Sequence, residues 1–194
     1  MKIIQFVMAY GVDHDRLRSI LPKGFTSLRP VLRINAEIRD GKTGYVEFNT
    51  AVETDDKKGW LNIGFWEDVP FTEDGQTVTF ESDFLKIRFT RVGVEGSCPA
   101  EKDNDGCYFL DANPKLRLPE NVTASKEFCD CEFAWHFEYK DENTGAHGVS
   151  TGKTLPAVPT KPQHEYPRQA FTVENAATIP CQQVLGSYMV EFKR

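Results

Sequence analysis

The chain has 194 residues, 40% hydrophobic and 27% charged, which excludes wholesale disorder and predicts one globular domain, residues 1–194. Its formal net charge of −6 comes without a basic stripe, so neither nucleic acid nor an anionic membrane is an expected partner. No apolar run approaches the ~20 residues of a membrane-spanning helix. An odd number of cysteines, five, without an export signal predicts free thiols and a cytoplasmic location.

The first predicted elements are a strand and a short helix. A near-continuous apolar run over residues 2–10 is typical of a strand that is buried on both faces. Asp13 can then cap a helix on which Leu17, Ile20 and Leu21 form one apolar stripe.

Alternation of apolar and polar residues predicts the strands that follow. Residues 31–39 and 45–53 are expected to pair as a hairpin through an Asp-Gly turn. Arg33, Asn35 and Glu47 lie on the polar sides of these two strands. Further strands are predicted at residues 60–66, 77–81, 84–92, 127–140 and 182–192.

Two irregular regions separate the later strands. Residues 93–119 form a long polar stretch that is predicted as a loop, and residues 152–169, with four prolines, are predicted as an extended crossover. The sum is many strands, one short helix and frequent turns. This pattern predicts a mainly β fold with minor α, as a barrel or curled antiparallel sheet.

Motifs for common chemistry are absent from the sequence. There is no zinc-protease signature, nucleophile elbow, phosphate loop or dinucleotide fingerprint, so neither a metal nor an organic cofactor is expected. Cys129 and Cys131 share the apolar face of their strand and are expected in the core rather than around zinc. His136 lies on a polar strand face, which fits either an acid/base cluster or a solvated outer face.

Three segments, in order, resemble the acetoacetate decarboxylase-like superfamily. They are FVMAYGVDHDRLRSILPKGF at 6–25, PVLRINAEIRDGKTGYVEFNTAV at 30–52 and GWLNIGFW at 59–66, with weaker similarity in FLKIRFTRVG and CQQVLGSYMVEFKR. The resemblance implies an antiparallel sheet that closes as a cone or barrel around an apolar cavity, and it implies homo-oligomers. In the decarboxylases a cavity lysine forms a Schiff base with a β-keto acid.

The same resemblance assigns individual positions. Glu47 matches a cavity glutamate of the superfamily, and Asn35 falls where the decarboxylases place a second glutamate. The lysine phrase Pro-Lys-Lys has no counterpart, because Glu-Asp-Val-Pro-Phe stands at residues 67–71. Schiff-base decarboxylation is therefore not expected.

These observations predict a protein that binds a small organic acid or carbonyl compound. Arg33, Asn35 and Arg88 are the expected ligand-binding residues, since arginine can pair with a carboxylate through two hydrogen bonds. Glu47 and His136 are the candidates for proton transfer. All of these roles require that the polar sides of the strands point into the hollow of the sheet.

Two other hypotheses stay open. One is an active lyase, hydrolase or isomerase of the same superfamily that uses Glu47 and His136. The other is a structural or interaction module in which Trp60, Trp66 or Trp135 forms a contact surface.

Overall fold

The alternation of apolar and polar residues, interrupted by turn residues, gives mostly β-strands in the described chain. The computed structural model describes residues 1–21, 23–54, 57–82, 85–96, 107–109, 115–117, 126–135, 142–144, 149–151, 179 and 181–194. The elements are, in chain order, β1 (Lys2–Gly11), α1 (His14–Ile20), β2 (Thr26–Arg39), β3 (Thr43–Thr54), β4 (Lys57–Glu67), β5 (Phe71–Asp74), β6 (Thr77–Glu81), β7 (Leu85–Gly96), β8 (Cys107–Phe109), β9 (Lys115–Arg117), β10 (Lys126–Trp135), β11 (Glu142–Thr144), β12 (Val149–Thr151) and β13 (Gln183–Lys193).

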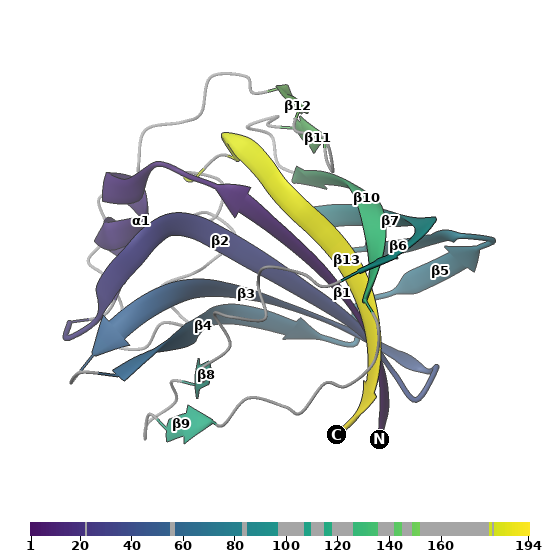
Figure 1. The fold of residues 1–194 in the computed structure, drawn as a ribbon, viewed down its shortest axis with the longest axis horizontal. Helices are drawn as coiled ribbons and strands as arrows, with labels where there is room; N and C mark the ends of the chain where they lie inside the picture. The colour runs from purple at the N-terminus through teal and green to yellow at the C-terminus, as the bar shows by residue number, and fades with distance from the viewer. Residues whose placement is uncertain are drawn as a thin grey trace.

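These strands form one sheet in the order β5-β6-β7-β10-β13-β1-β2-β3-β4-β8-β9, with β11 and β12 attached to β10. Neighbouring strands are antiparallel, apart from β8, which runs parallel to β4. Figure 1 shows the sheet curling, with the first strand β1 and the last strand β13 side by side. Within the described chain the outermost strands β5 and β9 do not pair with each other. The predicted mainly β fold with a curved antiparallel sheet is confirmed, as an open half-barrel.

The predicted N-terminal strands are present with small differences at their ends. β1 covers the predicted strand at residues 2–10, and β2 and β3 form the predicted hairpin, in which Arg39 pairs with Thr43. Asp40 and Gly41 have positive φ values of 50° and 66°. This is the conformation that an Asp-Gly hairpin turn favours, so the turn residues set the register of β2 and β3.

The structure differs from the prediction at residues 93–119. β7 continues beyond its predicted end because its backbone pairs with β10, and the short strands β8 and β9 lie where only a loop was predicted. Within the predicted strand 127–140, residues 136–140 lie outside the described part of the chain. The predicted crossover at 152–169 lies outside it as well.

One face of the sheet curls inward around an apolar core. Phe6 on β1 contacts Phe80 on β6 and Phe89 on β7, with ring centres 6.1 and 5.2 Å apart. Tyr10 on β1 similarly meets Phe133 on β10 at 5.8 Å. Because β13 and β10 separate β1 from β7 in the sheet, these contacts require that the apolar face is the concave one. The interior of the half-barrel is therefore filled by hydrophobic side chains.

Helix α1 packs against this core as its sequence predicts. Asp13 caps the helix, and its carboxylate accepts a hydrogen bond of 2.8 Å from the backbone N–H of Arg16. Leu17 and Ile20 are buried in the core on the inner side of the helix. With seven residues, this described helix is far too short to cross a bilayer.

Three thiols lie in the same core. Cys129, Cys131 and Cys181 are free and buried, as expected for the first two from the strand pattern. Burial raises the pKa of Cys129 to about 12 and that of Cys181 to about 11, and it raises the pKa of Cys131 as well. These side chains therefore behave as small hydrophobic residues with inert S–H groups.

Candidate functional site

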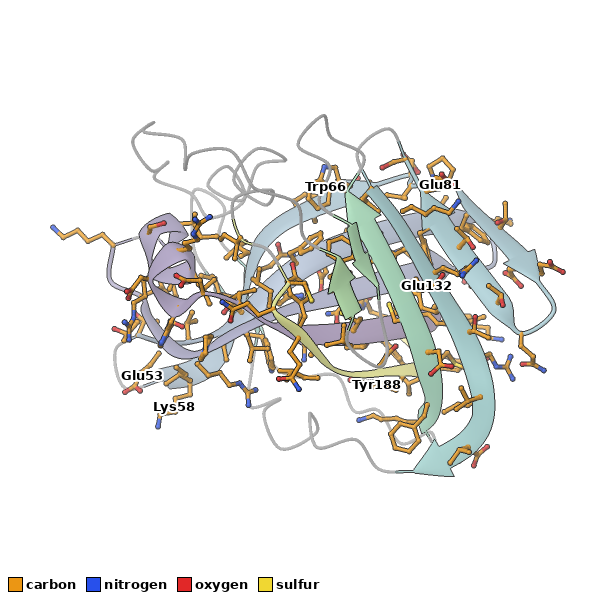
Figure 2. All side chains as sticks on the ribbon, turned by 90° about the horizontal axis from the view of Figure 1, so that it is seen from above. Glu53, Lys58, Trp66, Glu81, Glu132 and Tyr188 are labelled. Carbon is orange, nitrogen blue, oxygen red and sulfur yellow. The ribbon has the colours of Figure 1, made fainter. Side chains whose placement is uncertain are left out.

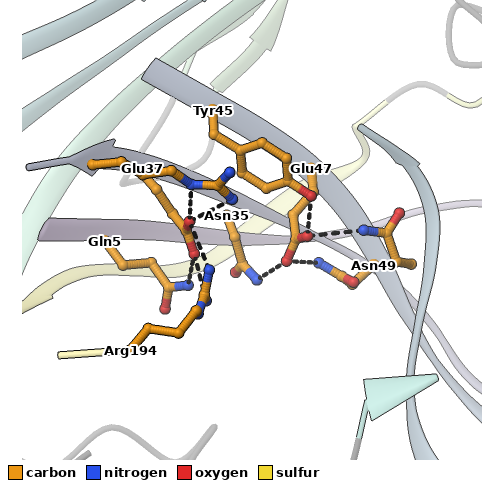
Figure 3. Close-up of polar contacts among 9 residues, drawn as sticks. Gln5, Asn35, Glu37, Tyr45, Glu47, Asn49 and Arg194 are labelled. Carbon is orange, nitrogen blue, oxygen red and sulfur yellow. Dashed lines mark hydrogen bonds and ion pairs between the residues drawn. The ribbon is translucent and has the colours of Figure 1, made fainter. Parts of the chain in front are cut away.

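The face of β2, β3 and β4 that points away from the apolar core carries buried polar side chains. Val46 and Phe48 of β3 are in the core, and Glu47 between them points to the opposite face. Its carboxylate accepts four hydrogen bonds, two at each oxygen (Figure 3). We call this group the Glu47 cluster; its donors are Asn35 Nδ2 at 2.8 Å, Asn49 Nδ2 at 3.1 Å, Tyr45 Oη at 2.7 Å and Asn62 Nδ2 at 2.8 Å.

Strand pairing explains why these residues meet. Asn35 on β2 lies directly opposite Glu47 on β3, and Asn49 on β3 lies opposite Asn62 on β4. A bulge between Phe48 and Asn49 shifts the register of β3 against β4 there, which leaves both amides on the side of Glu47. The cluster therefore depends on the pairing of three strands and not on one motif.

Tyr45 contributes its donor from the same strand as Glu47. Burial is the largest cause that raises its pKa well above the ordinary value, followed by the charge of Glu47 and the hydrogen bond to it. The Tyr45 hydroxyl consequently keeps its proton at neutral pH and donates a hydrogen bond to Glu47. Since an ionised carboxylate offers about four acceptor positions, the four donors together saturate Glu47.

Arg33 lies next to the cluster and is 5% exposed. It pairs across the strands with Asn49, and its guanidinium carbon stacks 3.9 Å from the ring centre of Trp60. Among the described residues no carboxylate pairs with Arg33, and its Nε has no hydrogen-bond partner. A buried cation without a counter-ion is energetically unfavourable, so this is the most unusual electrostatic feature of the face.

A second buried carboxylate on the same face is fully paired. Glu37 is 1% exposed and accepts hydrogen bonds from Gln5, from Arg39 at 2.8 Å, and from both terminal nitrogens of Arg194 at 3.0 and 3.2 Å. Arg39 also stacks on Tyr45, with its guanidinium carbon 3.6 Å from the ring centre. Glu37 therefore has the counter-ions that Arg33 lacks, and its role is structural.

Lys126 is a buried residue that the alternation of the sequence did not reveal. It lies at the first position of β10, one residue before the predicted strand, and its Nζ is 5.0 Å from the ring centre of Tyr188. Tyr188 pairs with Val7, which pairs with Asn35, so this aromatic ring shares the face of the Glu47 cluster. The signal that could have found Lys126 is its position next to a strongly alternating strand.

The structure brings together three of the five predicted site residues. Arg33, Asn35 and Glu47 lie side by side, but on the face opposite the apolar interior. The expectation that Glu47 points into the hollow of the sheet is therefore wrong, because the apolar sides of the strands fill that hollow. On the opposite face the three side chains are buried and still adjoin one another.

The two remaining predicted residues do not join this group in the described structure. Arg88 lies on β7, where its side chain is 47% exposed and forms an ion pair with Glu132 of the neighbouring β10, which is labelled in Figure 2. His136 lies outside the described residues. Within the described part of the chain, no group of three or more His, Cys, Asp or Glu side chains could hold a metal ion.

No protein-family model and no curated protein matches the sequence, but solved structures match the fold. Acetoacetate decarboxylase from Legionella pneumophila aligns with a TM-score of 0.55 and 13% identity, covering 98% of this chain and 81% of that one. This chain has the acetoacetate decarboxylase-like fold.

Other structures with this fold are similar to the same extent. The enduracididine biosynthesis enzyme MppR, solved in complex with pyruvate, aligns with a TM-score of 0.54 and 11% identity over 98% of this chain and 84% of that one. An acetoacetate decarboxylase-like enzyme from Sphingomonas wittichii RW1 aligns with a TM-score of 0.50 and 10% identity, covering 98% of this chain and 88% of that one. At such identities the acetoacetate decarboxylase-like fold is shared, and residue roles have to be argued from this chain's own side chains.

Proposed function

We propose that this chain binds a small organic acid or carbonyl compound beside the Glu47 cluster, with Arg33 pairing with the carboxylate of an acid. The observation that carries the proposal is the buried Arg33 guanidinium without a described counter-ion. A ligand carboxylate would supply the missing negative charge through two parallel hydrogen bonds. Unfavourable burial of this kind is expected where stability has been given up for binding.

The similar structures support this class of ligand. MppR was solved with pyruvate, a small keto acid, and in another crystal with the buffer HEPES. Because the identity to MppR is 10–11%, this support is at the level of the fold. The ligand class of this chain rests on Arg33 and its neighbours.

Glu47 takes a positioning role in this proposal. Its carboxylate accepts hydrogen bonds from the amides of Asn35, Asn49 and Asn62 and so holds them in one orientation beside Arg33. Proton transfer by Glu47, the second function expected from the sequence, would require that a ligand displace one of these donors. The saturated carboxylate therefore favours binding over acid/base catalysis.

The proposal is tested by thermal unfolding of the full chain against a panel of small keto acids, hydroxy acids and apolar carbonyl compounds. A ligand present at 100 times its dissociation constant should stabilise the protein by about 2.7 kcal/mol and raise its Tm measurably. A complete panel without any shift would contradict the proposal and favour an interaction module.

Replacing Arg33 by methionine separates binding from stability. We expect R33M to abolish the ligand-induced shift of a carboxylate, while the unliganded variant stays within about 1 kcal/mol of the original protein, because an unpaired buried charge is removed. The matched control is R39M, on the same strand and face. It removes one partner of the buried Glu37 and should lower the free energy of unfolding by roughly 2–4 kcal/mol. An R33M variant that still binds the carboxylate would contradict the assignment.

A further inference from the structure

The amides of the Glu47 cluster have a fixed orientation. An ionised carboxylate can only accept hydrogen bonds, so Asn35, Asn49 and Asn62 must each present their NH₂ group to Glu47. Each carbonyl oxygen Oδ1 consequently points away from the carboxylate. What these three oxygens meet distinguishes the asparagines from one another.

One of the three oxygens is satisfied within the protein. Asn62 Oδ1 accepts a hydrogen bond of 3.1 Å from the backbone N–H of Gly64. The oxygens of Asn35 and Asn49 are buried and have no hydrogen-bond partner in the described structure. Buried acceptors are rarely left in this state, and two of them beside the unpaired Arg33 indicate that a bound molecule completes the group.

The unpaired buried atoms around the cluster are of two kinds. Arg33 Nε and Trp60 Nε1 are donors, and Asn35 Oδ1 and Asn49 Oδ1 are acceptors. Trp60 joins this set because Arg33 stacks on its ring. A simple keto acid offers only acceptors, so it could satisfy the donors and would leave both amide oxygens without partners.

We infer that the ligand carries an N–H or O–H donor in addition to its carboxylate, as a hydroxy acid, an amino acid or an acid amide does. This inference rests on the proposed function, because it assumes that Arg33 binds the carboxylate. The carboxylate meets the guanidinium, and the donor meets Asn49 Oδ1, because Asn49 lies directly opposite Arg33 on the neighbouring strand. A site with buried acceptors discriminates strongly against an analogue that lacks the matching donor.

The experiment compares pairs of acids that share a carbon skeleton and differ in the donor. The probes are pyruvate with both lactate enantiomers, 2-oxobutyrate with both 2-hydroxybutyrate enantiomers, and acetoacetate with both 3-hydroxybutyrate enantiomers. Isothermal titration should show that a hydroxy acid binds at least about tenfold more tightly than its keto partner. Keto acids that bind as tightly as their partners throughout would overturn the inference and leave the proposed function intact. Absence of binding by all of them, together with a thermal panel that shows no shift, would contradict both.

Variants locate the preference on the unpaired oxygens. N49A and N62A each remove one hydrogen bond to Glu47, but only N49A also removes an unpaired acceptor. We expect the hydroxy-to-keto preference to fall to near one in N49A and to persist in N62A. Equal loss in both variants would overturn the assignment to Asn49. Because the preference is a ratio within one variant, it is measured independently of any loss of stability, and the comparison in the unmodified protein needs no variant.

Discussion

Glu47 shows how one side chain can organise a polar face that lies behind an apolar core. Three amides and one phenol donate to it, and none of these donors is charged. Glu47 therefore lies near Arg33 without forming an ion pair with it in the described structure. Arg33 stays available for an anion from outside, which is the residue-level basis of the proposed binding function.

Replacing Glu47 by glutamine should disrupt this group. A glutamine has one acceptor oxygen, and its own NH₂ group would face the donors that now point to the second carboxylate oxygen. Because buried donors would lose their partners, we expect the free energy of unfolding of E47Q to fall by roughly 2–4 kcal/mol, measured by urea denaturation.

The matched control for this change is E53Q. Glu53 lies further along β3 and forms a partly exposed ion pair with Lys58, with 3.9 Å between Nζ and Oε2; both residues are labelled in Figure 2. Exposed pairs contribute little, so E53Q should change stability by less than about 0.5 kcal/mol. Equal effects of E47Q and E53Q would show that the four hydrogen bonds to Glu47 do not stabilise the fold.

At this scale the sequence predicted the grouping and missed its surroundings. Alternation placed Arg33, Asn35 and Glu47 on the polar sides of two paired strands, and the structure confirms that they adjoin. Which side of a sheet becomes concave depends on strands far along the chain, so alternation within one hairpin could not show it. The unpaired oxygens of Asn35 and Asn49 could not be predicted either, because they follow from the register of three strands.

At the scale of elements, long alternating strands were predictable and short ones were not. β10 alternates clearly, and its cysteines lie in the core as expected. β8 and β9 have three residues each, too few for alternation to be recognised, and β8 pairs in parallel with β4. Such strands form because a neighbouring edge offers backbone partners, which a local pattern does not record.

The thiols of β10 and of the residues before β13 predict how stability depends on pH. The folded chain holds Cys129 and Cys181 with pKa values raised to about 12 and about 11, against about 8.5 in the unfolded chain. Above about pH 8.5 the unfolded chain releases protons that the folded chain retains. The contribution of the two thiols to the free energy of unfolding is therefore complete below that pH. It falls as the pH rises, by up to about 1.4 kcal/mol per pH unit for each thiol.

Urea denaturation between pH 7.5 and 9.5 measures this effect. The range stays below the ordinary pKa of tyrosine, so that the thiols are the groups whose titration is followed. The control is the variant C129A/C131A/C181A, which removes the three described core thiols. The packing that this variant loses with its sulfur atoms does not depend on pH, so the slopes of the two proteins are compared and not their absolute stabilities. We expect a flatter alkaline slope than in the original protein, and identical slopes would contradict the burial argument.

At the scale of the whole molecule, the fold is shared with decarboxylases whose chemistry depends on one amine. The resemblance over residues 6–66 predicted the fold correctly, although the aligned structures share only 10–13% of their residues with this chain. It also showed that the lysine phrase is absent, since Glu-Asp-Val-Pro-Phe occupies residues 67–71, from the last residue of β4 to the first residue of β5. A fold conserved at this distance constrains the sheet far more than it constrains the reaction.

Imine trapping tests whether this chain has kept the amine chemistry at another position. Lys126, a buried lysine on β10, has its Nζ against Tyr188, and β13, β1 and β2 separate its strand from that of Glu47. We therefore expect no lysine adduct when the full chain is treated with acetoacetate and sodium borohydride and its intact mass is measured. An acetoacetate decarboxylase treated in parallel is the positive control, because its Schiff base is reduced to a stable amine. A stable adduct on this chain, mapped by peptide mass to Lys126 or to any other lysine, would contradict the binding proposal in its present form and restore decarboxylation as the function.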